Sequence, residues 1–356
     1  MHRYRWLIFL VGFLLALVPT VLLTLLLMPI IRSWQEMDSV STSYALYQWR
    51  WPLLILGGIL LAAGGMYVWR ASKWPGKTLM ALLTLIVIGA QFMVATKMSA
   101  EIMFQEPSAI AFKSAESLID KDSENNEVMV VTINGDTKAY PVNMMGYHHK
   151  VLDYVGGTPV LVTYCTMCHT ARVFSPVIEG VVEHFRLVGA NNYNAMIEDA
   201  TTGSWWYQAT GECVAGPRKG QMLKEIAYTQ MTLAGLATRQ PNARVLIDDP
   251  KFVDHPAYMK SYDKNKGDTA SAISRRSMVY GVVVNGYPKA YRAQIFEREQ
   301  CMRDTVHSVA IVLVKNPYGM VAYEELAGTV DTSRAINVHQ EYWHSWKHFH
   351  PSTQLQ

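Results

Sequence analysis

The stretch VMVVTINGDTKAYP, residues 128–141, decides the fold that we expect for the larger part of this chain. Two predicted strands, residues 128–133 and 136–141, flank Asn134-Gly135, and an Asn-Gly pair in this setting is the strongest short-range signal for a β-hairpin. Gly156-Gly157 then precedes an apolar run from Thr158 to Tyr164, which predicts a buried strand. From Val128 onward the sequence therefore predicts a domain rich in β-structure.

A second segment repeats this plan. Residues 277–291, SMVYGVVVNGYPKAY, contain the same Asn-Gly turn and the same Lys-Ala-Tyr at a constant spacing, and Asp304 corresponds to Asp153. We therefore expect an internal duplication, with repeat-like halves at about 128–175 and 277–323. Two unrelated hairpins that share turn chemistry are the alternative.

The N-terminal part of the chain is strongly apolar. A bilayer core requires about 20 apolar residues, and three runs approach or exceed that length: Trp6–Ile31, about Trp51–Trp69 and Thr78–Ala95. The apolar region of a signal peptide would be shorter than the first run. We therefore expect three transmembrane helices in membrane lipid.

The regions together predict an α+β protein. We expect a membrane anchor over residues 1–97, a polar linker over 98–127 and an external β-rich domain over 128–356. Positive residues favour the cytoplasmic side of a membrane, which predicts a cytoplasmic N-terminus and an extracytoplasmic, periplasmic domain. The positive residues that carry this prediction are His2, Arg3, Arg5, Arg70, Lys73 and Lys77.

Composition excludes several classes of function. The chain has 356 residues, of which 50% are hydrophobic, and a formal net charge of +3. It contains no basic tract with interleaved aromatic residues, so nucleic-acid binding is not expected. Nor does it contain a nucleophile elbow, a phosphate-binding glycine loop or a His-Glu-x-x-His motif. Of the four cysteines, Cys213 and Cys301 are isolated in sequence, and whether they pair is left open.

The other two cysteines lie in Cys165-Thr-Met-Cys168-His169. Cys-x-x-Cys-His is the pattern by which haem c is attached, with the thiols bonded to the haem and the histidine as an axial ligand. Several residues are candidates for the second axial position, and none is singled out: His148, His149, His344, His348, His350, Met144 and Met145.

Two other chemistries suit the same residues. Thiolates together with His148 or His169 would suit copper or zinc, because soft ligands match these metals. Alternatively, Cys165 and Cys168 would cycle between a dithiol and a disulfide, at a rate set by the pKa of the first thiol. The remaining alternative involves neither metal binding nor redox cycling. It is a structural disulfide, or a pair of buried thiols beside an incidental histidine.

From about Val128 to its C-terminus the chain resembles the bacterial and archaeal domain-of-unknown-function family 3179. The features that carry the resemblance are Ala139-Tyr140-Pro141, His148, Asp153, Gly156-Gly157, Thr163-Tyr164-Cys165 with Cys168, Asp199 to Gln208, Gly211, Gly216-Pro217, Gly220, Tyr342 to Trp346, His350-Pro351 and Thr353.

The resemblance implies that the thiol pair is the inherited feature. Typical members of the family carry Cys-Pro-Leu-Cys-Gly at the motif, whereas this chain has Thr166 for the proline and His169 for the glycine. The resemblance also favours His148 over its neighbour His149 as a ligand or acid-base group. It implies no particular reaction.

A polar cluster between the two halves is a further candidate. The resemblance sets Asp199, Thr202, Ser204, Trp206 and Gln208 near the cysteine loop, where they would line a pocket for a substrate or a haem edge. Residues of these types also organise tight turns by accepting hydrogen bonds from backbone amides. We consider the turn the stronger interpretation.

The C-terminal tail places His344 and His348 one helical turn apart, with His350 beyond them. Histidines at i and i+4 can share a metal or face a haem. The aromatic residues Trp343, Trp346 and Phe349 recur at near-helical spacing, which favours an amphipathic helix that packs on the domain.

Three functions follow as expectations, and whether the protein is an enzyme is left open. The first is a membrane-anchored electron carrier with haem c at Cys165, Cys168 and His169. The second is an exported dithiol protein or a copper- or zinc-binding protein. The third is a non-catalytic subunit that binds partners, such as respiratory or other membrane-complex subunits, through its spans. In each case the expected location is a bacterial or archaeal cytoplasmic membrane.

Overall fold

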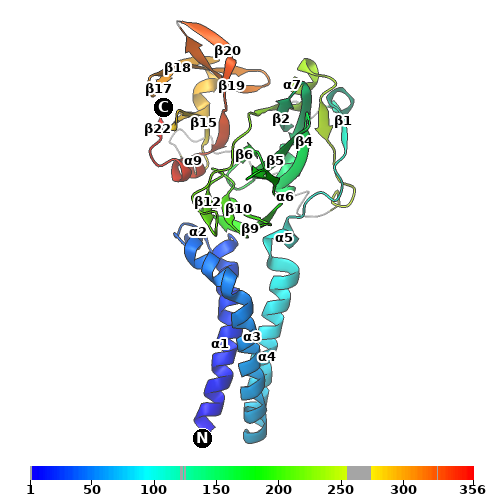
Figure 1. Ribbon diagram of the computed structural model, residues 1–356, viewed down its shortest axis with the longest axis vertical. Helices are drawn as coiled ribbons and strands as arrows, with labels where there is room; N and C mark the ends of the chain where they lie inside the picture. Colours follow the sequence, from blue (N-terminus) through cyan, green and yellow to red (C-terminus); the bar gives the residue numbers. More distant parts are fainter. Residues whose placement is uncertain (1, 121–122, 124–125, 255–273, 327) are drawn as a thin grey trace. The chain divides into compact units, whose positions relative to one another are not determined.

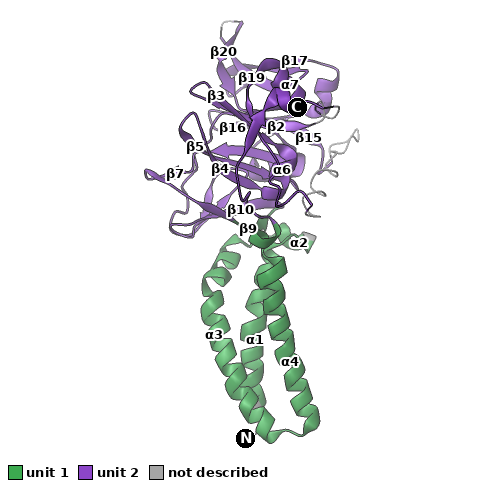
Figure 2. Cartoon of the chain, turned by 90° about the vertical axis from the view of Figure 1, so that its right-hand side faces the viewer, with its two compact units in different colours: residues 1–103, 187–192 green, residues 104–186, 193–356 purple. Residues whose placement is uncertain are grey.

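The computed structural model describes residues 2–120, 123, 126–254, 274–326 and 328–356. The chain divides into two compact units, which Figure 2 distinguishes by colour. The first unit comprises residues 1–103 together with 187–192, and the second comprises residues 104–186 and 193–356.

The first unit is helical. Three of its helical stretches, Trp6–Leu27, Val40–Ala71 and Trp74–Met98, are long and apolar enough to cross a membrane, which fits the predicted anchor. The second is longer than the span predicted from the sequence. The helices are α1 (His2–Leu27), α2 (Arg32–Gln35), α3 (Val40–Ala71), α4 (Trp74–Met93), the π-helical η1 (Val94–Met98) and α5 (Ala100–Met103).

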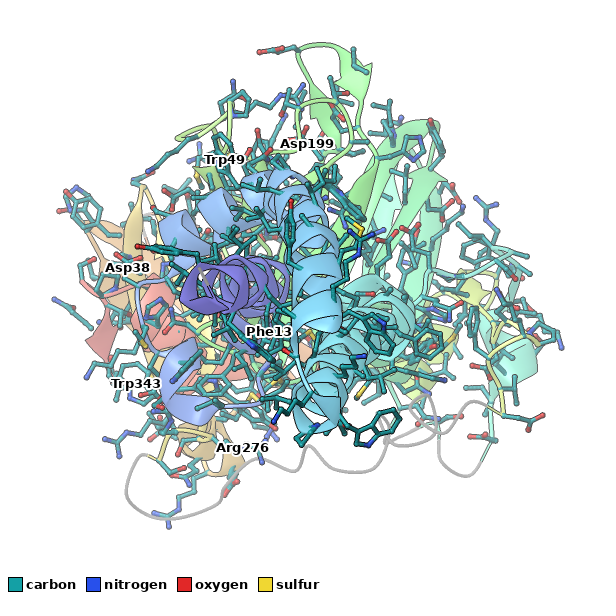
Figure 3. All side chains as sticks on the ribbon, turned by 90° about the horizontal axis from the view of Figure 1, so that it is seen from below. Phe13, Asp38, Trp49, Asp199, Arg276 and Trp343 are labelled. Atoms are coloured by element: carbon teal, nitrogen blue, oxygen red, sulfur yellow. The ribbon has the colours of Figure 1, made fainter. Side chains whose placement is uncertain are left out.

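Small residues let α1 and α3 approach closely, as is usual for helices in membranes. A Cβ atom at Gly64 of α3 would lie 2.6 Å from the backbone nitrogen of Phe9, so a larger residue would push the helices apart. Gln91 of α4 donates a hydrogen bond of 2.7 Å to the carbonyl of Ala16 on α1. Trp49, labelled in Figure 3, is exposed on α3.

The second unit contains a nine-stranded sheet with the order β1-β14-β3-β2-β13-β19-β18-β17, and β20 pairs with β19 (Figure 1). Its strands are β1 (Phe112–Ser114), β2 (Glu127–Ile133), β3 (Asp136–Pro141), β13 (Thr229–Thr232), β14 (Arg244–Leu246), β17 (Cys301–Val306), β18 (Val309–Asn316), β19 (Gly319–Leu326) and β20 (Thr329–Ile336). Strand β1 falls within residues 98–127, which the sequence analysis treated as a linker, and it pairs antiparallel with β14.

Smaller sheets complete the second unit. They are β4-β5-β6, formed by Lys150–Val155, Thr158–Cys165 and Thr170–Phe174, and β21-β15-β16-β22, formed by His339–Tyr342, Met278–Val284, Tyr287–Arg292 and Gln354–Leu355. The remaining strands are β7 (Val177–Ile178), β8 (Val181–Val182), β9 (Phe185–Asn191), β10 (Asn194–Asp199), β11 (Trp205–Tyr207) and β12 (Cys213–Ala215).

Short helices lie between these strands. They are η2 (Ala115–Leu118), α6 (Val142–His148), α7 (Leu233–Arg239), η3 (Ala293–Glu297) and α9 (Trp343–Phe349). Helices at the N-terminus and many sheets in the remainder confirm the predicted α+β class.

Both predicted Asn-Gly hairpins are formed. Asn134 and Gly135 have φ angles of 52° and 79°, and Asn285 and Gly286 have φ angles of 51° and 83°. A two-residue turn with positive φ at both positions matches the right-handed twist of the strands it joins, and asparagine and glycine adopt it at the lowest cost.

The two strands of each hairpin and the two strands that follow them have matching lengths and spacing in the two segments. β2, β3, β4 and β5 have the same lengths as β15, β16, β17 and β18, and each begins 151 residues before its counterpart, as Glu127 does before Met278. In the first segment Lys138 forms an ion pair with Asp153, which also accepts a hydrogen bond from Tyr140. Lys289, Tyr291 and Asp304 repeat these contacts. A common origin of the segments stays a prediction.

The Lys138–Asp153 pair provides a test of this arrangement. Lys138 Nζ lies 2.8 Å from both carboxylate oxygens, and the two side chains are only 7% and 10% exposed. Asp153→Ala would leave a buried ammonium group without its counter-ion, which costs about 3–5 kcal/mol. We expect the free energy of unfolding of the full chain in detergent to fall by this amount in a urea titration.

Asp304→Ala is the matched control, because its ion pair with Lys289 is more exposed, at 17% and 12%. We expect a smaller loss of stability in that variant. Equal urea midpoints for Asp153→Ala and the unchanged protein would contradict this account of the core.

Candidate functional site

The cysteine motif forms the turn between β5 and β6. Cys165 ends β5 and pairs with Thr170, the first residue of β6, so that four residues close the hairpin. His169, the last of them, has a left-handed φ of 54°. Glycine adopts this conformation without steric cost, and histidine adopts it more often than most residues do. A glycine at this position would therefore fit the same backbone without strain.

The ring of His169 is directed into the protein. Its Nδ1 lies 2.8 Å from the hydroxyl of Tyr164, and its Nε2 lies 3.3 Å from the side-chain amide of Gln340 and 3.6 Å from Glu127. Burial raises the pKa of the Glu127 carboxyl, but its hydrogen bonds with His169, Gln230 and Gln340 outweigh burial and hold that pKa below its usual value. Both ring nitrogens of His169 therefore face protein groups.

The two thiols are buried and differ in acidity. The thiol of Cys168 donates to the sulfur of Cys165, and this hydrogen bond is the largest cause of a lowered pKa at Cys165. Backbone N–H groups of Cys168, Ala195 and Met167 also point at that sulfur and oppose the effect of its burial. Burial and the neighbouring Cys165 raise the pKa of Cys168 well above its ordinary value. Of the two thiols, Cys165 therefore loses its proton at the lower pH. In the neutral form its thiol donates a hydrogen bond of 3.3 Å to the carbonyl of Tyr193.

Helix α9 and the end of β21 adjoin Cys168. The backbone N–H of Tyr342 donates to the carbonyl of Cys168 over 2.9 Å. His344 Nε2 lies 3.8 Å from Cys168 Sγ, and the side chain of Ser345 also contributes a hydrogen bond to this thiol. His344 is therefore the one tail histidine predicted from the sequence that reaches a sulfur among the contacts of the described residues.

A buried polar network lies behind the loop. Arg172 on β6 forms an ion pair of 2.9 Å with Glu341 on β21, and both side chains are almost fully buried. Glu341 also accepts hydrogen bonds of 2.7 Å from Thr170 and 2.9 Å from Ser345. Arg172 and Glu341 were not among the site residues predicted from the sequence. A lone arginine inside the run Thr170-Ala-Arg-Val-Phe174 was the available signal, because charged residues are almost never fully buried without a partner.

The polar cluster predicted between the halves forms a turn that connects β10 and β11. Asp199 accepts hydrogen bonds of 2.7 Å from the backbone of Thr202 and 2.9 Å from the indole of Trp206, and its carboxylate lies 3.0 Å from Arg218. Ser204 and Thr202 share a hydrogen bond of 2.7 Å. These contacts hold Asp199, Thr202 and Ser204 in the turn and tie Asp199 to Trp206 on β11 and to Arg218.

Gln208 differs from the rest of that cluster because it reaches the strands on either side of the cysteine loop. Its amide donates to the hydroxyl of Thr163 on β5 and to the carbonyl of Thr170 on β6, each over 3.0 Å. Gln208 therefore fixes the base of the hairpin that carries the two thiols.

The other candidate histidines lie elsewhere. His148 is hydrogen-bonded to the carbonyl of Gln105 and packs against Phe252. Burial lowers the pKa of His149 to about 4. His348 is exposed, and His350 packs against Trp346 with ring centroids 4.1 Å apart. Within the described ranges, no group of three or more His, Cys, Asp or Glu side chains is placed to hold a metal ion.

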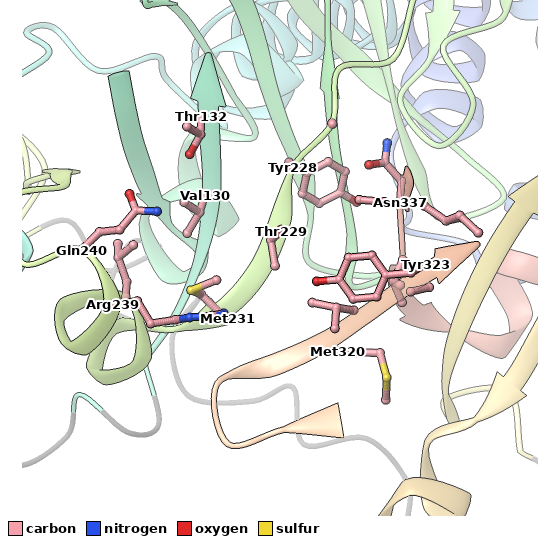
Figure 4. Close-up of a pocket in the computed structure, with 17 residues that line it drawn as sticks. Val130, Thr132, Tyr228, Thr229, Met231, Arg239, Gln240, Met320, Tyr323 and Asn337 are labelled. Carbon is pink, nitrogen blue, oxygen red and sulfur yellow. The ribbon is translucent and has the colours of Figure 1, made fainter. Parts of the chain in front are cut away.

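A cavity of about 470 Å³ lies apart from the motif, beside β2, β13, β19 and α7 (Figure 4). Its walls include Tyr228, Met231, Arg239, Tyr323 and Asn337. None of the site residues predicted from the sequence lines it.

Comparison with known proteins gives one match. A family model described as "Protein of unknown function (DUF3179)" matches residues 105–353. No curated protein and no solved structure matches the chain. The matched range includes the cysteine loop, the buried ion pair and α9.

The acidity of the two thiols gives a prediction. In the reduced protein, ultraviolet absorbance of the thiolate should report one ionisation below the ordinary thiol pKa of about 8.5, because Cys165 is stabilised as an anion. Cys165→Ser should remove this transition. Cys168→Ser should move it to higher pH, since the main hydrogen bond to the Cys165 sulfur is weakened.

Cys213→Ser is the control, because burial raises the pKa of the Cys213 thiol to about 11 and it should not contribute near neutral pH. If the absorbance transition below the ordinary thiol pKa persists in Cys165→Ser, a group other than Cys165 causes it.

Proposed function

This chain belongs to the DUF3179 family, and on that premise we propose that it is a membrane-anchored dithiol redox protein in which Cys165 and Cys168 cycle between two thiols and a disulfide. The observation that carries the proposal is the placement of two buried thiols in one hairpin turn, where the Cys168 thiol donates to the Cys165 sulfur and lowers the pKa of Cys165. A reactive pair requires a nucleophilic thiolate and a second thiol that resolves the intermediate.

The proposed step is a thiol–disulfide exchange. The Cys165 thiolate attacks one sulfur of a disulfide in an exported partner, and the other partner sulfur leaves as a thiolate. Cys168 then loses its proton, bonds to Cys165 and releases the second partner sulfur. Two electrons pass to the partner, which becomes a dithiol, while the protein acquires the Cys165–Cys168 disulfide. The reverse sequence oxidises a partner dithiol.

The loop tip controls access to the sulfurs. Cys165 and Cys168 are 2% and 0% exposed, whereas Thr166 and Met167 between them are half-buried. Thr166 also donates a hydrogen bond of 3.2 Å to the carbonyl of Gly146. Displacement of the two tip residues would expose the thiols to a partner. A covered pair also resists uncontrolled oxidation, because susceptibility to oxidation follows exposure.

The anchor supports a location outside the cytoplasm. Three apolar helices suit membrane lipid, and the positive residues at the start of the first helix and between the second and third favour a cytoplasmic N-terminus under the positive-inside rule. We propose that the second unit lies outside the cytoplasmic membrane, where disulfides form and persist.

We also propose that the two segments with one strand plan arose by duplication and that only the first retained redox chemistry. Asn316 ends β18 as Cys165 ends β5, and Gly319 then begins β19. The second segment therefore keeps the strands but has no cysteine at the positions that correspond to Cys165 and Cys168.

Haem c attached at Cys165, Cys168 and His169 is the second candidate, and the pentapeptide itself is the observation that favours it. The described arrangement suits this candidate less well. Both thiols are covered, and both ring nitrogens of His169 face Tyr164, Gln340 and Glu127, so haem attachment would require the loop to open. Copper or zinc on the two thiolates is a further candidate, supported by the softness of sulfur ligands alone.

The dithiol proposal predicts a trapped intermediate. Cys168→Ser should retain the attacking thiolate but lose the resolving thiol, so treatment with glutathione disulfide should leave a stable glutathione adduct on Cys165. Cys165→Ser should form no adduct at this motif. Mass spectrometry of the full chain in detergent measures both outcomes, with Cys301→Ser as the control for the exposed thiol. Equal labelling of Cys165 and Cys301 in Cys168→Ser would refute a specialised pair.

His169→Gly separates the dithiol from the haem candidate. Glycine suits the left-handed backbone at this position but removes the hydrogen bonds to Tyr164 and Gln340, each of which contributes about 0.5–1.5 kcal/mol. We expect thiol–disulfide cycling to persist in this variant, because neither thiol depends on the imidazole.

The unchanged protein, produced together with haem-attachment machinery, should then give no pyridine haemochrome spectrum. Covalent haem on that chain would establish the haem candidate in place of the dithiol. Stoichiometric copper or zinc that is lost in Cys165→Ser would instead support a metal site.

A further inference from the structure

Cys168 needs a proton acceptor if it is to act as the resolving thiol. Burial and the neighbouring Cys165 hold its pKa well above the ordinary value, so at neutral pH it carries its proton. Only the thiolate is an effective nucleophile. The exchange proposed above therefore requires a group that removes this proton while Cys168 attacks.

His344 lies in position to do so. Its Nε2 is 3.8 Å from Cys168 Sγ, although the two residues are 176 positions apart in the sequence. The other ring nitrogen, Nδ1, lies 2.8 Å from the carbonyl oxygen of Arg275. A carbonyl only accepts hydrogen bonds, so Nδ1 must carry the proton in the neutral ring, and the lone pair of Nε2 faces the thiol.

The surroundings keep the ring in its basic form. Burial is the main cause of a lowered pKa at His344, and the positive charges of Arg275 and Arg276 add to it. The hydrogen bond to the Arg275 carbonyl and the negative charge of Glu341 oppose the shift without cancelling it. The rings of Tyr193 and Tyr342 complete the environment at 5.9 and 6.2 Å.

We propose that His344 is the general base that takes the proton of Cys168 during resolution of a mixed disulfide on Cys165, a role that rests on the dithiol function proposed above. The Cys168 proton moves to His344 Nε2, a bond forms between Cys168 Sγ and Cys165 Sγ, and the bound partner leaves as a thiolate. His344 is half-buried, so the imidazolium can then release its proton to water or to the departing thiolate.

The Arg275 carbonyl determines which ring nitrogen of His344 is free to accept a proton. If Nδ1 were free, the neutral ring could place its proton on either nitrogen and present an N–H to the thiol for part of the time. The fixed hydrogen bond leaves the acceptor on the side of Cys168. The same device, in which one ring nitrogen is held so that the other can act, is general among catalytic histidines.

His344→Asn tests the proposal in the full chain in detergent, with glutathione disulfide as the probe. Asparagine is polar and can donate to the Arg275 carbonyl, but its amide is not a base. Quenched-flow mass spectrometry follows two rates, the formation of the Cys165–glutathione adduct and its loss to the Cys165–Cys168 disulfide. His348→Asn is the matched control, because His348 lies one turn along the same helix and is exposed.

We expect adduct formation to stay within about 2-fold of the unchanged protein in both variants, since His344 contacts the sulfur of Cys168 and not that of the attacking Cys165. Adduct loss should be about 100-fold slower in His344→Asn at pH 7, in line with the usual contribution of a general base, and unchanged in His348→Asn. The deficit should shrink as the pH rises, because hydroxide can then remove the proton.

Two other outcomes would distinguish a failure of the role of His344 from a failure of the dithiol function. Adduct formation followed by equally fast loss in His344→Asn would overturn the role of His344 and leave the dithiol function intact. No adduct on Cys165 in any variant, including Cys168→Ser, would overturn the dithiol function and the role of His344 with it.

Discussion

The buried ion pair between Arg172 and Glu341 is the contact on which the candidate site depends. It joins β6, which follows the cysteine loop, to β21, which leads into the helix that carries His344 and Ser345. Loss of one partner would leave an uncompensated charge in the interior, at a cost of about 3–5 kcal/mol. Because Thr170 and Ser345 also donate to Glu341, the loop and the helix are fixed to the same carboxylate.

This network explains how two cysteines in a simple hairpin acquire different properties. The hairpin alone supplies the backbone N–H groups of Met167 and Cys168 that stabilise the Cys165 thiolate. Burial raises the pKa of Cys168, so this thiol keeps its proton. Helix α9 brings the imidazole of His344 beside it. Local turn geometry therefore sets the acidity of the first thiol, and long-range packing sets that of the second.

The parts of the fold that the sequence predicted well are those governed by local rules. The two Asn-Gly hairpins and the three apolar helices depend on neighbouring residues and on length, and both appear as expected. The contacts among Arg172, Glu341, His344 and Cys168 depend on which strands meet, and spacing along the chain carries no information about them. The sequence named His344 as one of several tail histidines, but nothing in the helical spacing distinguished it from His348. Likewise, Cys-x-x-Cys-His emphasised His169, whereas the backbone there is left-handed and the two ring nitrogens contact Tyr164 and Gln340.

The account centres on a redox-active pair, and the reduction potential of Cys165 and Cys168 tests it most directly. Structural disulfides lie below about −300 mV, whereas catalytic pairs lie above it. Equilibration of the full chain in glutathione buffers, with alkylation of the free thiols and Cys213 and Cys301 replaced by serine, should give a single two-electron transition above about −300 mV. A pair that stays reduced in the most oxidising buffer, or a disulfide that no glutathione buffer reduces, would contradict the account.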